Sequence, residues 1–188
     1  MTALERALAL IARFLDEHRI PYMIIGGIAN LVWGEPRSTL DVDASLLVEE
    51  TQWPSLMKEL RSIVRIIPRN PIAFLKDTHV LPVETSDGVR IDLIWATLPY
   101  EHQAIARATI EEVTGQRIRV RVCRPEDLVI HKVLSARPKD QEDVRAIIHQ
   151  QRARLDRPYV NRIVGELAKA LDRPEMVEFL ARCFRESR

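Results

Sequence analysis

Residues 24–43 read Ile-Ile-Gly-Gly-Ile-Ala-Asn-Leu-Val-Trp-Gly-Glu-Pro-Arg-Ser-Thr-Leu-Asp-Val-Asp, and the fold is decided in this stretch. An apolar run over 22–25 stops at Gly26-Gly27, and a short apolar run follows over 28–32. This pattern predicts a strand, a tight turn and a helix of at most two turns. Paired glycines let a backbone approach a bulky ligand, and the free N–H groups at a helix start bind phosphate. Gly26 and Gly27 are therefore predicted to bind phosphate.

Two acids, Asp41 and Asp43, open the next predicted strand. Residues two apart on a strand point to the same face, so the two carboxylates stand side by side and repel each other. A divalent cation relieves this repulsion, and Mg²⁺ prefers carboxylate oxygens and substrate phosphates. The alternative is a polar edge of an exposed strand. The nearby glycine turn, Arg37 and Thr39 favour a metal–nucleotide site.

A third candidate acid, Asp92, lies in the strand predicted over 89–95. The strand alternates, and Asp92 shares its less apolar face with Arg90 and Ile94. A lone charge between apolar neighbours is costly, so Asp92 is either partnered or functional. An ion pair with Arg90 is the structural alternative to a role as metal ligand.

The combination of Gly26-Gly27 with Asp41-Val42-Asp43 resembles the signature of the nucleotidyltransferase (polymerase beta-like) superfamily. The form of residues 37–43, Arg-Ser-Thr-Leu-Asp-Val-Asp, most resembles the abortive-infection-type toxin branch. The resemblance implies an α+β (α/β-like) fold, with a mixed central sheet flanked by helices and further C-terminal helices. It also implies a nucleoside triphosphate substrate and two Mg²⁺ ions, with Asp41, Asp43 and Asp92 as catalytic residues and metal ligands.

A second block, over 126–143, resembles the same branch. There a Lys and an Asp downstream of the acids serve the nucleotide site, which by match implies this role for Lys132 and Asp143. Arg137 and Asp140 are matched more weakly. The alternative is a helical hairpin held together by ion pairs. By this organisation, residues 1–124 form the nucleotidyltransferase core with its N-terminal helix, and residues 125–188 form a C-terminal helical region.

Apolar periodicity and turn residues predict the remaining elements. Helices are expected over 2–18, 51–61, 99–112, 125–136, from 139 onward, 160–171 and 174–183; strands over 62–67, 80–83 and 117–122; and a loop at 69–71. The first helix begins with a capping-box pattern, Thr2 and Glu5.

The strand at 117–122 alternates between apolar residues and Arg117, Arg119 and Arg121. A row of arginines binds a polyanion such as RNA, or simply faces solvent. No aromatic residue for base stacking lies in this strand.

The composition leaves the partner open. The chain has 188 residues, a net charge of +1 and two cysteines without metal-site spacing. No signal pattern or membrane-length apolar run is visible, so we expect a cytoplasmic protein.

Together these features predict a Mg²⁺-dependent nucleotidyltransferase that acts on a hydroxyl acceptor. The resemblance does not give the acceptor, since the relatives it implies modify tRNA ends, proteins or small hydroxylated antibiotics. One candidate is a toxin that acts on tRNA and is paired with a separate antitoxin protein. The alternatives are an enzyme that modifies an antibiotic or other small molecule, and a nucleotide-binding module without turnover.

Overall fold

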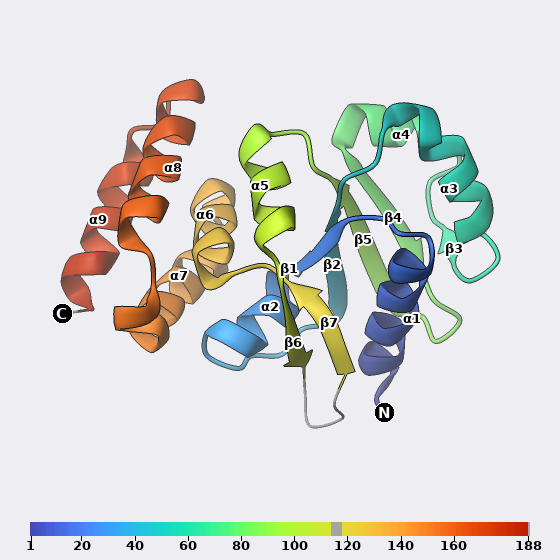
Figure 1. Ribbon diagram of the computed structural model, residues 1–188, viewed down its shortest axis with the longest axis horizontal. Coiled ribbons are helices and arrows are strands. Elements are labelled where there is room, and N and C mark those ends of the chain that lie inside the picture. Colours follow the sequence, from blue (N-terminus) through green and yellow to red (C-terminus); the bar gives the residue numbers. More distant parts are fainter. Residues whose placement is uncertain (114–117, 188) are drawn as a thin grey trace. The chain divides into compact units, whose positions relative to one another are not determined.

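The computed structural model describes residues 1–113 and 118–187, which group into two compact units (Figure 1). Unit 1 comprises Met1–Ile28 and Ser38–Cys123, and unit 2 comprises Ala29–Arg37 and Arg124–Arg188. Residues 29–37 are thus grouped with the C-terminal helices, although they lie among the core residues in the sequence. The boundary at 124/125 expected from the sequence stays a prediction.

Unit 1 is built on one mixed sheet with the strand order β3-β4-β5-β2-β1-β7-β6. The strands are β1 (Tyr22–Ile25), β2 (Asp41–Leu46), β3 (Arg65–Ile66), β4 (Val80–Glu84), β5 (Arg90–Trp95), β6 (Thr109–Val113) and β7 (Ile118–Val122). Strand β2 runs parallel to β5 and antiparallel to β1, while β1 runs parallel to β7. The predicted fold class, a mixed sheet flanked by helices, is confirmed.

The helical elements of unit 1 are α1 (Ala3–Glu17), the short 3₁₀ turn η1 (Glu50–Gln52), α3 (Trp53–Leu60), α4 (Pro71–Thr78) and α5 (Pro99–Arg107). Helices α1, α4 and α5 contact strands of the sheet (Figure 1). The capping box of α1 is confirmed: the Glu5 N–H donates to Thr2 Oγ1 over 3.2 Å, and the Thr2 N–H donates to Glu5 Oε2 over 2.7 Å.

Two sequence-based expectations were wrong. The helix expected over 99–112 ends at Arg107, and residues 109–113 form the edge strand β6 against β7. Its exposed and half-buried residues give no clear strand pattern without the partner strand. Helix α4 was missed altogether, because Leu75 is its only buried residue and the segment has no apolar stripe. Its start is marked by Asn70, whose Oδ1 accepts from the Ala73 N–H, and by Pro71.

One strand is shorter than expected. Only Arg65–Ile66 of the segment 62–67 pairs as a strand.

Unit 2 is a helical bundle. Helix α2 (Gly26–Trp33) starts in unit 1, and its residues from Ala29 onward are grouped with unit 2. The other elements are α6 (Pro125–Ser135), α7 (Pro138–Gln151), the 3₁₀ turn η2 (Arg152–Arg154), α8 (Arg157–Ala170) and α9 (Glu175–Glu186). Their buried faces include Val129, Ile147, Val164 and Leu180. Across the described part of the chain, every helix is too short or too polar to span a bilayer.

Candidate active site

The three candidate acids of unit 1 lie on two neighbouring strands in matching register. Asp41 and Asp43 alternate along β2, and Asp43 lies directly opposite Asp92 of β5. Side chains of paired residues point to the same face of a sheet, so all three carboxylates share one face. Each is partly buried. This placement requires the parallel pairing of β2 with β5, which joins segments about 50 residues apart in the sequence.

The two glycines allow two site side chains to come close to the backbone. Gly26 has φ +64°, and a Cβ built on it lies 1.9 Å from Asp43 Oδ2. A Cβ on Gly27 lies 2.3 Å from Thr39 Oγ1. Both distances are far below van der Waals contact. The close approach of Asp43 and Thr39 therefore explains, within unit 1, why glycine occupies both positions. The role of the two glycines in phosphate binding stays a prediction.

We expect Gly26→Ala to destabilise the protein by about 2 kcal/mol or more. An alanine in the left-handed region costs about 1–2 kcal/mol, and the new methyl group would also push Asp43 aside. Urea denaturation measures this change. Gly88→Ala is the matched control, because Gly88 has φ +77° but nothing within 4 Å of its Cβ position. An equal loss in both variants would show that the contact with Asp43 has no effect.

Each of two acids already has a hydrogen-bond donor in the structure. The Thr39 hydroxyl donates to Asp41 Oδ1 over 3.0 Å, and Arg90 Nε donates to Asp92 Oδ1 over 2.8 Å. The hydrogen bond to Asp92 raises the pKa of Arg90 above its ordinary value. The negative charges of Asp41 and Asp43 raise it further. The ion pair weighed from the sequence as an alternative for Asp92 is therefore present.

Within residues 1–113 and 118–187, no group of three or more His, Cys, Asp or Glu side chains is arranged to hold a metal ion. The donor chemistry nevertheless fits Mg²⁺. Asp41, Asp43 and Asp92 are hard oxygen donors on one face of adjacent strands. In this structure the Asp92 carboxylate accepts a hydrogen bond from Arg90 Nε.

The other candidate residues come together in unit 2, in a chain of ion pairs around Lys132. Lys132 is 4% exposed, and its Nζ donates to Asp143 Oδ2 over 2.5 Å and to Asp140 Oδ1 over 3.2 Å. Arg37 Nε and Nη2 donate to the Asp143 carboxylate over 3.0 Å each. Arg37 and Asp143 are 106 residues apart in the sequence.

Asp140 connects this cluster to Arg137. Its Oδ2 accepts from Arg137 Nε over 2.6 Å and from Ser135 Oγ over 2.8 Å. Burial alone would raise the pKa of Asp140, but the hydrogen bonds from Arg137 and Ser135 and the charge of Lys132 hold it below its ordinary value. The buried acids are therefore ionised at neutral pH. Ser135 was missed from the sequence, since nothing in its neighbours indicates a role.

The pKa of Asp143 is lowered in the same way. Burial acts to raise its pKa, while the hydrogen bonds from Arg37 and Lys132 lower it below the ordinary value. Next to this cluster, burial and the charge of Lys132 lower the pKa of His131 to about 4, so this imidazole is neutral at pH 7. The ion-paired hairpin considered from the sequence is thus present, and a nucleotide-binding role for these residues stays a prediction.

One of the two described arginines of β7 lies opposite an acid of β6. Arg119 lies opposite Glu112 of β6, and Arg121 lies opposite Ile110. All four side chains are exposed. Arg117 lies outside the described residues. The exposed face of this hairpin is therefore less basic than the sequence of β7 alone indicates.

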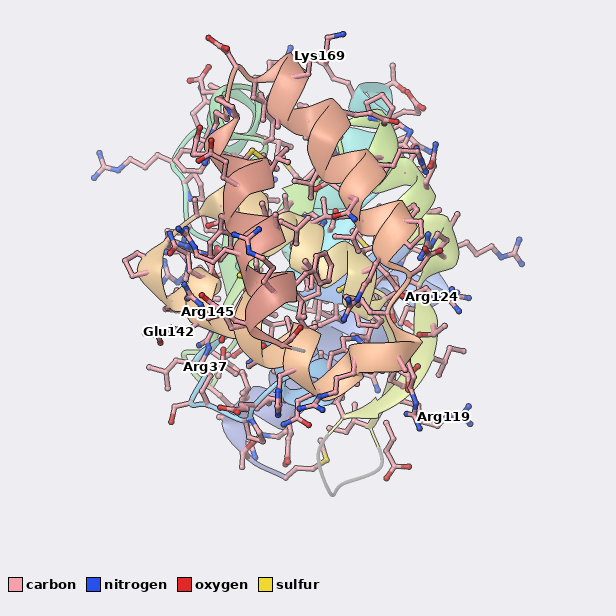
Figure 2. All side chains as sticks on the ribbon, turned by 90° about the vertical axis from the view of Figure 1, so that its left-hand side faces the viewer. Arg37, Arg119, Arg124, Glu142, Arg145 and Lys169 are labelled. Atoms are coloured by element: carbon pink, nitrogen blue, oxygen red, sulfur yellow. The ribbon has the colours of Figure 1, made fainter. Side chains whose placement is uncertain are left out.

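A cavity of about 370 Å³ in unit 2 carries three carboxylates that the sequence did not bring to attention. Glu35, Glu142 and Glu186 line it together with Arg145, whose Nε lies 3.3 Å from Glu186 Oε2. Figure 2 shows Glu142 and Arg145 on α7, with Arg37 on the same side of this unit. The three acids of the cavity belong to segments that lie far apart in the sequence, so no short sequence motif marks the cavity.

The chain is similar to a known protein family and to solved structures. The model of a family described as "Nucleotidyltransferase of unknown function (DUF6036)" matches residues 2–184. The sequence has no match among curated proteins.

Solved structures share the fold. An antigenic nucleotidyltransferase-like protein from Paracoccidioides brasiliensis is 21% identical, with 95% of this chain and 92% of that chain covered and a TM-score of 0.53. ANT(2")-Ia in complex with adenylyl-2"-tobramycin is 17% identical, with 96% and 99% covered and a TM-score of 0.55.

Proposed function

Because the chain belongs to the nucleotidyltransferases of unknown function (DUF6036), we propose that it transfers a nucleoside monophosphate from a nucleoside triphosphate to a hydroxyl acceptor. The observation that carries this proposal is the register of β2 and β5, which brings Asp41, Asp43 and Asp92 to one face beside the Gly26-Gly27 turn. A structural domain without chemistry gives no reason for three acids on one face.

In this proposal Asp41, Asp43 and Asp92 would hold two Mg²⁺ ions, which would supply activation of the attacking hydroxyl and neutralisation of charge on the leaving pyrophosphate. The N–H groups at the Gly26-Gly27 turn bind phosphate oxygens. Thr39 orients the carboxylate of Asp41 through the hydrogen bond that the structure contains.

The residues of unit 2 receive their proposed roles from the resemblance described above. Arg37, Lys132 and Arg137 supply positive charge to the triphosphate, and Asp143 positions Arg37 and Lys132 through its two carboxylate oxygens. The cluster has three cations and two acids, so it keeps a net positive charge that suits a phosphate ligand.

For the acceptor we propose RNA, with tRNA as the expected target. The exposed Arg119 and Arg121 of β7 support this choice. From the resemblance to the abortive-infection branch we further propose that the protein is a toxin controlled by a separate antitoxin protein. Expression of the wild-type chain should then arrest bacterial growth, and expression of Asp43→Asn should not.

A small cationic acceptor is the second candidate. The cavity lined by Glu35, Glu142 and Glu186 favours it, because three carboxylates against one guanidinium attract a positively charged ligand. ANT(2")-Ia, which shares the fold, has been solved with adenylyl-2"-tobramycin.

Incubation with Mg²⁺ and each labelled nucleoside triphosphate tests both candidates. Separate reactions contain total bacterial RNA, a protein extract or a cationic aminoglycoside. Label on RNA supports the first candidate, and label on the aminoglycoside supports the second. Triphosphate binding without any labelled product would indicate a nucleotide-binding module instead of an enzyme.

Matched variants then assign the acceptor site. Arg119→Gln with Arg121→Gln should weaken RNA binding and reduce its salt dependence, while Arg13→Gln with Arg61→Gln removes the same charge from other exposed positions of unit 1. If Arg119→Gln with Arg121→Gln leaves the salt dependence of RNA binding unchanged, the arginines of β7 face solvent and do not bind RNA. Glu142→Gln should raise the KM for a cationic acceptor only.

A further inference from the structure

Charged side chains of alternating sign run across four strands of the unit 1 sheet. Arg65 of β3 pairs with Glu84 of β4, Glu84 pairs with Arg90 of β5, and Arg90 pairs with Asp41 of β2. Paired residues share a face, so this row lies on the same face as Asp43 and Asp92. Arg90 therefore has acidic neighbours on both flanking strands and on its own strand.

The hydrogen bonds show which of these acids Arg90 contacts. Glu84 Oε2 accepts from Arg65 Nε and Nη2, over 3.2 and 2.5 Å. Arg90 instead donates from Nε to Asp92 Oδ1 over 2.8 Å. The Asp92 side chain is 19% exposed and the Arg90 side chain 55% exposed, so the acid is fixed within the sheet while the guanidinium borders solvent.

We propose that Arg90 is an internal counterion that competes with the divalent cation for Asp92. The inference rests on the function proposed above. A guanidinium and a divalent cation repel each other, so both cannot occupy the same side of one carboxylate. Metal binding at Asp92 requires the Arg90 side chain to move away, and its exposure leaves solvent free for that movement.

This arrangement has two consequences. Without metal, the guanidinium offsets the repulsion among the three acids and lets them share one face of the sheet. With metal, the released guanidinium carries five N–H donors beside the acids, where anionic phosphate oxygens approach. Arg90 is thus a positioning residue whose removal strengthens metal binding in the absence of nucleotide.

The test is calorimetric titration of the full chain with Mn²⁺, without nucleotide, since Mn²⁺ accepts the same oxygen ligands. We expect Arg90→Ala to bind Mn²⁺ about tenfold more tightly than the wild-type protein, because a charge-assisted hydrogen bond no longer competes. Arg90→Lys should lie between them, as lysine keeps the charge but not the planar fork. The difference should shrink in high salt.

Arg6→Ala is the matched control. Arg6 Nε donates to Asp87 Oδ2 over 2.8 Å, and the Arg6 side chain is 51% exposed, so the variant loses the same charge and a similar contact away from the acids. Arg65→Ala is unsuitable, because it would free Glu84 to attract Arg90. Thermal unfolding establishes that each variant is folded, and Arg90→Gln replaces Arg90→Ala if the latter is not.

The outcomes separate this inference from the proposed function. If Asp43→Asn abolishes Mn²⁺ binding but Arg90→Ala and the wild-type protein bind equally, the counterion role is overturned and the proposed metal site stands. A gain equal to that of Arg6→Ala also overturns the counterion role. If no variant binds Mn²⁺, both proposals fail.

Discussion

Replacing Asp43 by asparagine is expected to lower the rate of nucleotidyl transfer by about 10³-fold or more. Asp43 lies between its two partners on the sheet, opposite Ile25 of β1 and opposite Asp92 of β5, and beside the Gly26 backbone. Asparagine has the same shape but lacks the negative charge that a divalent cation requires. Single-turnover assays with labelled triphosphate and the acceptor found above measure the loss.

Two controls are needed to interpret the result for Asp43→Asn. Asp87→Asn removes a carboxylate from the turn between β4 and β5, and we expect transfer to be unchanged. Thermal unfolding of Asp43→Asn should show a melting temperature near that of the wild-type protein. Transfer at the wild-type rate by a folded Asp43→Asn protein would falsify the proposed metal site.

The second large effect is expected for Lys132→Met, which should reduce the free energy of unfolding by about 3 kcal/mol. The substitution keeps the length of the side chain but leaves Asp140 and Asp143 buried with less positive charge. Arg37 and Arg137 still contact these acids, so the expected loss lies at the lower end for a broken buried pair. Urea denaturation at pH 7 measures it.

Lys139→Met is the matched control, because Lys139 is exposed at the start of α7. It should change the free energy of unfolding by less than about 0.5 kcal/mol. A similar loss in both variants would contradict a stabilising role for the buried pairs. Triphosphate binding by the folded Lys132→Met protein then tests the proposed role of Lys132 in nucleotide binding. Ion pairs that only stabilise the fold do not predict weaker binding.

The same variant changes the acid sensitivity of the protein. The pKa values of Asp140 and Asp143 are lowered in the folded protein from an ordinary value of 3.8. Their contribution to stability is therefore complete above that pH and is lost as the pH falls through the lowered values. Because Lys132 is one cause of the lowering, Lys132→Met should lose stability less steeply below about pH 4.

Much of unit 1 follows from local patterns in the sequence. The period of two along a strand places Asp41 and Asp43 on one face whatever the strand pairs with. The glycine pair ends β1 and starts α2, and the capping residues Thr2 and Glu5 start α1. These features depend on backbone geometry within a few residues. The glycine pair and the two acids also carry the resemblance that implied the fold class and the nucleotidyltransferase family, both of which are confirmed.

Elements without a local signal were not predicted. Helix α4 buries only Leu75, and β6 becomes a strand through its pairing with β7. In both cases the deciding interactions come from residues outside the element, so no periodicity within the element marks it. The acidic cavity of unit 2 has the same origin, since Glu35, Glu142 and Glu186 belong to three separate segments.

The sequence by itself thus determined the pair of acids on one strand face and the glycine pair at the start of α2, and its resemblance to nucleotidyltransferases implied the fold class. Only the tertiary structure decided that Asp92 lies opposite Asp43 and that Asp143 joins Lys132 to Arg37. The physical reason is the range of the interactions. Alternation along a strand is fixed by backbone geometry, whereas strand register and buried ion pairs are fixed by the packing of segments far apart in the chain.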